Sequence, residues 1–255
     1  MLNNKLKSIS IFYPCFNEEK NIPIFVNQAL KVLPQIALRY EIIIVNDGSR
    51  DNTLKVAQKI AADNSVVKIV NHKQNRGYGA ALKSGFKASK FDWVFFTDGD
   101  LQFDLKQLID FLPFTSKYSV IIGYRKTRAE GFQRALNAKI LKITMNILYR
   151  LHVRDIDCAY KLIKKDALEN IKLVSEGAFL SSELLYRLKK KGYKFKEICV
   201  NHYPRKFGNP TGNNIKVMIR GIKETFMLYL FMKFNLFSKH YGSSIKDQDI
   251  VVSKS

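Results

Sequence analysis

Short apolar runs rich in Val, Ile and Phe alternate with helical patterns over the first half of this chain. Five runs have the length and composition of buried strands, at residues 9–14, 41–46, 66–71, 92–98 and 119–123. Apolar side chains recur every three or four positions in the segments between them, at residues 21–33, 51–61, 79–89 and 104–112. This alternation predicts an α/β fold in which helices cover both faces of a mostly parallel sheet.

The alternation fades after residue 124, and a strongly basic half follows. The chain has a formal net charge of +21, and residues 116–255 carry 28 basic against 11 acidic side chains, compared with 15 and 11 in residues 1–115. Helical patterns occur at 132–151 and 181–192, and a strand-like pattern at 194–203. The surplus of positive charge predicts an anionic partner, such as phosphate groups, nucleic acid or acidic lipid, unless it serves only solubility.

The same change of pattern suggests how the chain is divided. We expect one domain over residues 1–210, with a nucleotide-binding half at 1–124 and an acceptor half at 125–210. An amphipathic helix on the membrane surface is expected at 211–240, because its apolar run is too short to cross a bilayer. The polar tail 241–255 is expected to be disordered. Three cysteines without metal-ligand spacing, and an N-terminus without a signal-peptide pattern, predict a cytoplasmic protein.

Polar side chains cluster directly after the predicted strands, where ligands bind in a doubly wound sheet. The segments are PCFNEE, NDGSRDNT, a glycine-rich stretch from residue 71 to 85, and TDGDLQ. Four such strand ends predict one shared polar site. Asp47 is placed either to accept hydrogen bonds from a ribose or base, or to serve a turn. Arg76 and Lys83 are available to bind phosphate.

Asp98 and Asp100 stand one residue apart after the fourth predicted strand. Two carboxylates so close repel each other unless a cation lies between them, and oxygen ligands suit Mg²⁺ or Mn²⁺. Such an ion would bridge the protein and a diphosphate and would neutralise charge on a departing phosphate. The structural alternative is an Asp-Gly turn that only joins two elements.

The four polar segments, in this order and spacing, resemble the inverting family-two glycosyltransferases over residues 8–210. Within that family the chain is similar to the dolichyl-phosphate mannose synthase and polyprenyl-phosphate glycosyltransferase branch, through GDLQ, GYR, DIDCAYKLIKKDAL and EICVNHYPRKFG. The resemblance implies the GT-A fold, a Rossmann-like nucleotide-diphospho-sugar transferase sandwich with C-terminal amphipathic helices. It implies metal-dependent transfer from a UDP- or GDP-sugar to a polyprenyl phosphate. Residues 158–161 and 209–211 depart from the pattern of that branch.

The resemblance also implies roles for the matching residues. The nucleotide would be held by Pro14, Asn17, Glu18 and Asp47, and we complete the nucleotide-sugar site with Gly48, Arg76, Lys83 and Asp98. The metal ligands would be Asp98, Asp100 and Gln102. The donor and acceptor phosphates would meet Arg125, Arg134 and Arg205.

The acceptor decides whether the reaction needs a base. A sugar hydroxyl must lose its proton to a carboxylate, whereas a polyprenyl phosphate is already anionic at neutral pH. Asp157 and Glu183 are the candidate bases, which we expect to be catalytic together with Asp100. Pairing with neighbouring Lys or Arg is their structural alternative. The basic second half favours the phosphate acceptor and an anionic membrane surface.

We therefore expect four partners at the cytoplasmic face of the membrane: a nucleotide-sugar donor, polyprenyl phosphate, anionic lipid and a membrane protein. One alternative is a glycosyltransferase that acts on a saccharide hydroxyl in cell-surface polysaccharide synthesis. A second alternative is a basic nucleic-acid-binding module. It explains the charge but not Asp98 and Asp100, and the sequence has no zinc finger, helix-turn-helix or aromatic-basic RNA motif. We expect no nucleic-acid partner.

Overall fold

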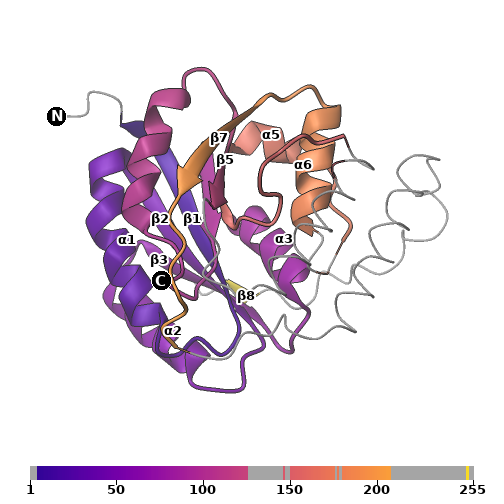
Figure 1. Ribbon diagram of the computed structural model, residues 1–255. Helices are drawn as coiled ribbons and strands as arrows, with labels where there is room; N and C mark the ends of the chain where they lie inside the picture. Colours follow the sequence, from indigo (N-terminus) through magenta and orange to yellow (C-terminus); the bar gives the residue numbers. More distant parts are fainter. Residues whose placement is uncertain are drawn as a thin grey trace.

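A mostly parallel sheet between two layers of helices forms the centre of the protein (Figure 1). The computed structural model describes residues 5–125, 146, 150–175, 177, 180–207 and 251–252. In these residues the sheet has the strand order β7-β5-β6-β4-β1-β2-β3-β8. The strands are β1 (Leu6–Cys15), β2 (Ala37–Asp47), β3 (Val67–His72), β4 (Trp93–Thr97), β5 (Val120–Arg125), β6 (Tyr160–Lys164), β7 (Phe195–Val200) and β8 (Val251–Val252).

The strand directions bring most carboxyl ends to one edge of the sheet. β1 pairs in parallel with β2 and β4, and β2 pairs in parallel with β3. β6 runs antiparallel to both β4 and β5, and β5 is parallel to β7. Since β6 reverses the direction twice, β5 and β7 run the same way as β1. The segments that follow β1, β2, β3, β4, β5 and β7 therefore meet at the same edge.

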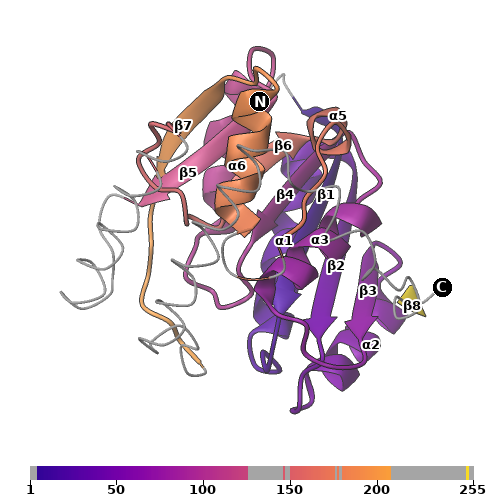
Figure 2. The same cartoon turned by 90° about the vertical axis from the view of Figure 1, so that its right-hand side faces the viewer.

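The helices divide between the two faces of the sheet. They are α1 (Ile22–Ile36), α2 (Thr53–Asp63), α3 (Tyr78–Ala88), the 3₁₀ helix η1 (Leu105–Phe114), α5 (Lys165–Glu169) and α6 (Leu180–Lys190). Side chains alternate along a strand, so Ile11 packs in the core with α1 and η1, while Phe12 packs in the core with α3, α5 and α6. Figure 2 shows α3 and α6 against the second face.

Helix α3 packs closely against the sheet at Gly85, near the end of the helix. A Cβ atom added at Gly85 would come within 2.3 Å of the Phe12 ring. Only a glycine leaves room for that ring, so the sequence sets the distance between α3 and β1.

The C-terminal expectations fall mostly outside the described residues. Almost all of the predicted helix at 132–151, and all of the expected amphipathic helix at 211–240, belong to the part that is not described. Val251–Val252 forms β8, antiparallel to β3, and the expectation of a disordered tail at 241–255 stays a prediction. The edge of β3 offers main-chain groups to a further strand, and β-branched residues suit one. In the described ranges, no helix has both the length and the apolar content to cross a membrane.

Candidate functional site

The loop after β4 holds two carboxylates in a confined space. Asp98 is half-buried and Asp100 is buried. The hydroxyl of Tyr78 donates to Oδ1 of Asp98 at 2.9 Å, and the amide of Gln102 donates to Oδ1 of Asp100 at 3.1 Å. Burial and the nearby Asp100 charge raise the pKa of Asp98 from 3.8 to about 7. A bound cation would therefore reduce the electrostatic repulsion between the two carboxylates.

A positive side chain reaches these carboxylates from the segment after β7. The guanidinium of Arg205 forms an ion pair with Glu18, and its Nη1 lies 3.9 Å from Oδ2 of Asp100. Burial raises the pKa of Glu18, while its contacts with Asn21 and Arg205 oppose that shift. Three side chains that the sequence predicted for the site, Glu18, Asp100 and Arg205, are thus brought together from three separate loops.

The segment that carries Arg205 is fastened to the loop after β4. The amide of Tyr203 donates to the carbonyl of Gln102 at 2.8 Å, and Nε2 of Gln102 donates to the carbonyl of Tyr203 at 3.0 Å. The amide of Asn201 donates to Oε1 of Gln107 at 2.8 Å. The side-chain nitrogen of Gln102 therefore helps to hold the Arg205 segment against the loop after β4. That its side-chain oxygen binds a metal stays a prediction.

Asp47, at the end of β2, holds the loop between β3 and α3. Its Oδ1 lies 2.6 Å from Nδ1 of His72 and accepts the amide of Arg76 at 2.9 Å, and its Oδ2 accepts the amide of Gly77 at 2.9 Å. The carboxylate is buried. Since a carboxylate has about four acceptor positions, a further bond to a nucleotide is compatible with these contacts.

Asn17 and Glu18 tie the loop after β1 to the loop after β2. The amide of Asn17 donates to the Ser49 hydroxyl at 2.9 Å, and its Oδ1 accepts the amide of Arg50 at 2.8 Å. The amide of Glu18 donates to the Thr53 hydroxyl at 2.8 Å. Asn17 has a positive φ of 58°, a conformation that asparagine tolerates better than most residues. A cleft of about 190 Å³ lies beside this loop, between Glu18 and Phe207.

Pro14 and Gly48, also predicted for the nucleotide site, shape the backbone. Pro14 lies opposite Val45 where β1 and β2 pair. Gly48 has a φ of +64°, and a Cβ atom there would lie 2.2 Å from the carbonyl carbon of Gln74. The loops after β2 and β3 therefore touch at a point where only glycine fits.

The residues predicted to bind or activate the acceptor differ in their environments. Nε and Nη2 of Arg125, at the end of β5, donate to the two carboxylate oxygens of Asp155 at 2.7 and 3.0 Å. This two-bond pair fixes the guanidinium plane. Asp157 is exposed two residues further along. Arg134 lies outside the described residues.

Glu183 and Lys83 both bond the main chain of Val174 on the α3 and α6 side of the sheet. The carboxylate of Glu183 is fully buried and accepts the amides of Val174 and Ser175 at 2.7 to 3.1 Å. It also accepts Nε of Arg187 at 2.6 Å. Nζ of Lys83 donates to the carbonyl of Val174 at 3.3 Å. These contacts favour the structural alternative for Glu183.

Two residues of the site were missed by sequence reasoning. Tyr78 bonds Asp98, and its only sequence signal is its place after Gly77, at the start of a helix beside a strand end. Lys161 is fully buried, and its Nζ donates to the carbonyl of Ile156 at 3.1 Å. Burial lowers the pKa of Lys161. Its sequence signal is a lysine flanked by Tyr160 and Leu162 in a strand-like stretch.

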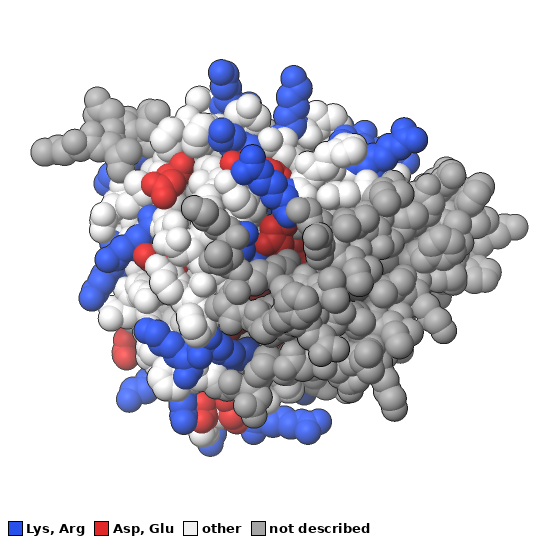
Figure 3. Space-filling view, in the orientation of Figure 1, with Lys and Arg blue, Asp and Glu red and all other residues white. Residues whose placement is uncertain are grey.

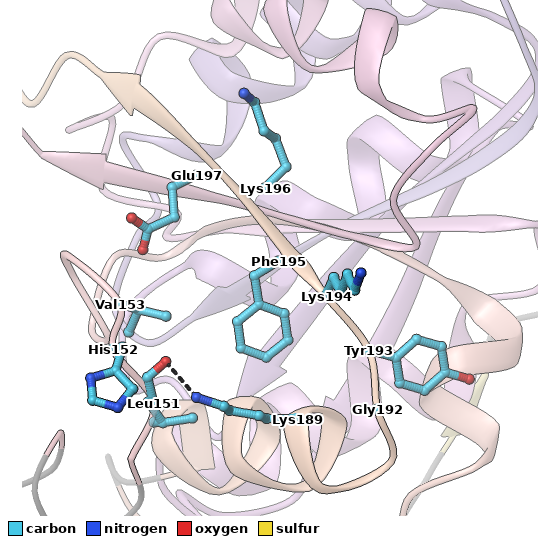
Figure 4. A pocket seen from close by; sticks show the side chains of 10 residues that line it. All are labelled: Leu151, His152, Val153, Lys189, Gly192, Tyr193, Lys194, Phe195, Lys196 and Glu197. Atoms are coloured by element: carbon cyan, nitrogen blue, oxygen red, sulfur yellow. Dashed lines mark hydrogen bonds between the residues drawn. The ribbon is translucent and has the colours of Figure 1, made fainter.

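A larger groove lies elsewhere, at the amino end of β7. It encloses about 580 Å³ beside the end of α6, and Nζ of Lys189 donates to the carbonyl of Leu151 at 3.2 Å across its floor (Figure 4). Phe195 begins β7 here, whereas Val200 ends β7 near the segment that carries Arg205. The groove is therefore separate from the site at the carboxyl ends.

The donor set after β4 fits a divalent cation. Asp98 and Asp100 supply hard oxygen ligands, and their mutual repulsion favours an ion between them. No group of three His, Cys, Asp or Glu side chains in the described residues could hold a metal alone. An ion here would therefore need water or substrate oxygens as well, which is how Mg²⁺ is commonly bound.

The family model described as Glycosyl transferase family 2 matches residues 10–172. Dodecaprenyl-phosphate galacturonate synthase of Rhizobium johnstonii is 24% identical over 242 residues, covering 93% of this chain and 71% of that protein. Undecaprenyl-phosphate 4-deoxy-4-formamido-L-arabinose transferase of Aeromonas hydrophila is 26% identical over 172 residues, or 66% of this chain. The aligned part spans only 52% of the length of the Aeromonas protein.

Solved structures agree on the architecture. Glucosyl-3-phosphoglycerate synthase from Mycobacterium tuberculosis, crystallised with Mn²⁺, UDP and glucosyl-3-phosphoglycerate, matches with a TM-score of 0.66 at 18% identity, covering 88% of this chain and 80% of that chain. The same enzyme crystallised with Mg²⁺ and UDP also gives a TM-score of 0.66. At this identity the likeness shows the fold alone. It confirms the expected GT-A fold with a mostly parallel central sheet.

Proposed function

The chain belongs to glycosyl transferase family 2, and on that basis we propose that it transfers a sugar from a UDP- or GDP-sugar to a polyprenyl phosphate. The observation that carries the proposal is the Asp98 and Asp100 pair at the carboxyl ends of the strands, with Arg205 beside Asp100. A paired carboxylate site beside a guanidinium suits a cation-bound diphosphate next to a second phosphate. Two relatives named for polyprenyl-phosphate substrates support the acceptor class.

Asp98 and Asp100 would hold Mg²⁺ or Mn²⁺, with the oxygen of Gln102 as a third ligand. The ion, when bound, supplies positive charge that stabilises the departing diphosphate. Pro14, Asn17, Glu18, Asp47 and Gly48 would line the nucleotide. Arg76 and Lys83 would lie near its phosphates.

The acceptor phosphate would attack the anomeric carbon from the side opposite the diphosphate. The new bond joins a phosphate oxygen to that carbon, the bond to the diphosphate oxygen breaks, and the configuration inverts. Because the acceptor oxygen is already anionic at neutral pH, no side chain needs to remove a proton. The guanidinium of Arg205, which now contacts Glu18 and lies near Asp100, would bind a substrate phosphate in their place. Arg125 and Arg134 would bind the acceptor phosphate.

One observation favours the alternative acceptor, a saccharide hydroxyl. Asp157 is exposed, close in sequence to the Arg125–Asp155 pair, and could remove a proton from a hydroxyl. In either case we place the enzyme at the cytoplasmic face of a membrane, where anionic lipid and a membrane protein would be its partners.

The test is consumption of UDP- and GDP-sugars by the purified protein with Mn²⁺, with and without a short-chain polyprenyl phosphate. We expect turnover only when both the metal and the lipid phosphate are present. Asp100→Asn should lower kcat by about 10²- to 10³-fold, since metal stabilisation of a leaving group is worth several kcal/mol. Asp104→Asn is the matched control, because the Asp104 side chain caps the amide of Lys106 and asparagine caps equally well.

The outcomes separate the alternatives. Turnover with an oligosaccharide but not with the lipid phosphate would move the assignment to the saccharide acceptor. Absence of metal-dependent nucleotide binding would contradict the donor site itself.

A further inference from the structure

Tyr78 makes a direct contact with one of the two acidic residues after β4. It is the first residue of α3, and its hydroxyl donates to Oδ1 of Asp98 at 2.9 Å. A carboxylate that accepts a hydrogen bond on one oxygen has fewer orientations open to it. The remaining lone pairs then point in directions that the protein has fixed.

The backbone before Tyr78 is itself held in place. The amides of Arg76 and Gly77 both donate to the carboxylate of Asp47, each at 2.9 Å. Gly77 has a φ of +91°, which lets the chain turn into the helix at this point. The backbone position from which the Tyr78 side chain extends is therefore held by two hydrogen bonds from the residues immediately before it.

Asp47 is held in turn by a buried polar chain. Its Oδ1 lies 2.6 Å from Nδ1 of His72, and Nε2 of His72 lies 2.8 Å from the Ser84 hydroxyl. The exposed fractions of Asp47, His72 and Ser84 are 4%, 1% and 7%, so water has little access to these bonds. Because Ser84 belongs to α3, the chain of bonds closes on the helix that Tyr78 begins.

From this arrangement we propose that Tyr78 is a positioning residue for the metal-binding carboxylate of Asp98. The hydroxyl fixes one oxygen of Asp98 and leaves the other for the cation, while Asp47, His72 and Ser84 hold the loop that presents Tyr78. The inference rests on the proposed function, in which Asp98 is a metal ligand. Groups that orient a ligating side chain typically change metal affinity or activity by ~10- to 100-fold when they are removed.

The test compares Mn²⁺ binding by the full-length wild type, Tyr78→Phe and Tyr193→Phe, measured by calorimetry in the presence of UDP and, separately, GDP. Phenylalanine keeps the ring and removes only the hydroxyl. We expect Tyr78→Phe to weaken Mn²⁺ binding about 10-fold. Tyr193 is the matched control, since its hydroxyl contacts the exposed amide of Asn170 at 3.3 Å, away from the acidic pair.

Further readouts distinguish positioning from a general loss of structure. The Tm of Tyr78→Phe should stay close to that of the wild type, and saturating Mn²⁺ should restore most of its kcat. Equal Mn²⁺ affinity in the wild type and Tyr78→Phe would overturn the inference and leave the proposed function standing. Equal weakening in Tyr193→Phe would also overturn it. If the wild type binds no Mn²⁺ with either nucleotide, both the inference and the proposed donor site fail.

Discussion

At the scale of single residues, the fold places the Asp98 carboxylate close to that of Asp100, so that the two repel each other where a cation would bind. Its carboxyl group is flanked by Asp100 and by the Tyr78 hydroxyl, and burial adds to the cost of its charge. Asp100 in turn lies beside Arg205. The two acidic residues therefore have different neighbours, although they are only one position apart in the sequence.

The raised pKa of Asp98 makes the metal-free protein sensitive to pH. Its pKa is raised from 3.8 to about 7, so the folded state favours the protonated form. The resulting stabilisation is fully present below about pH 4, near the pKa of the unfolded state. It is lost as the pH rises through about 7, the pKa in the folded state. We expect Asp98→Asn to remove this part of the pH dependence.

The measurement is Tm against pH, from 4 to 8, in the presence of a chelator. The quantity of interest is the difference between the wild type and Asp98→Asn, because other carboxylates titrate in the same range. Asp63→Asn changes an exposed carboxylate and should behave like the wild type. Parallel curves for the wild type and Asp98→Asn would contradict the assigned shift.

Sequence reasoning found several site residues but not the contacts between them. Asp100 could be named because it lies in a polar segment after a predicted strand, whereas Glu18 and Arg205 were implied by the family resemblance. Tyr78 could not, because a hydroxyl reaches Asp98 only after α3 has packed on β1. Likewise the buried environment of Glu183 depends on main-chain amides from another segment, which the pattern of a helix does not reveal.

At the scale of elements, the alternating pattern was a sound guide. All five strands predicted in the first half are confirmed, and the strand-like pattern at 194–203 corresponds to β7. β6 was missed, because Lys161 occupies a buried position in the YKLIK run and breaks the apolar pattern. The helix predicted at 104–112 is the 3₁₀ helix η1, which extends to Phe114.

Glu183 provides a prediction about α6. Its carboxylate holds the amides of Val174 and Ser175 and the side chain of Arg187. Hydrogen bonds to a charged group are worth ~1.5 to 3 kcal/mol, so Glu183→Gln should lower the free energy of unfolding by about 2 kcal/mol. The kcat of the folded protein should remain within about threefold of the wild type, because a change of ~0.6 kcal/mol or less is expected from a group outside the reaction.

Urea unfolding and activity assays on the same preparations measure both effects. Glu169→Gln is the control, because that side chain is 64% exposed and its ion pair with Lys165 is 3.8 Å long. Such exposed pairs contribute ~0.5 kcal/mol or less. A loss of kcat of about 100-fold with unchanged stability would instead identify Glu183 as a base.

At the scale of the whole molecule, positive charge is spread widely. Figure 3 shows Lys and Arg side chains scattered over the described part of one face, with a few acidic side chains between them. The net charge of +21 comes mainly from residues 116–255. The arrangement of the two halves could not be predicted, because β6 reaches β4 and β5 through antiparallel pairs that no local pattern encodes.

Together with the proposed lipid acceptor, this positive charge predicts electrostatic binding to an anionic bilayer. We expect the protein to sediment with vesicles that contain ~30% anionic lipid, since each basic side chain near the surface adds ~1 kcal/mol. Neutral vesicles are the control and should retain little protein. Binding should fall as NaCl is raised from ~0.1 to ~0.5 M, because salt screens exposed charges. Equal binding to both vesicle types would count against electrostatic attachment.

The ion pair between Arg205 and Glu18 also has a consequence for the order of events during synthesis. A ribosome that has released residues 5–125 has delivered Glu18, Asp98 and Asp100, but not Arg205, whose guanidinium contacts Glu18 and lies near Asp100. The growing chain thus contains these three carboxylates before it contains Arg205. Only when β7 has joined β5 does the following segment bring Arg205 into place. The site at the carboxyl ends of the strands is therefore completed by a residue that is synthesised late.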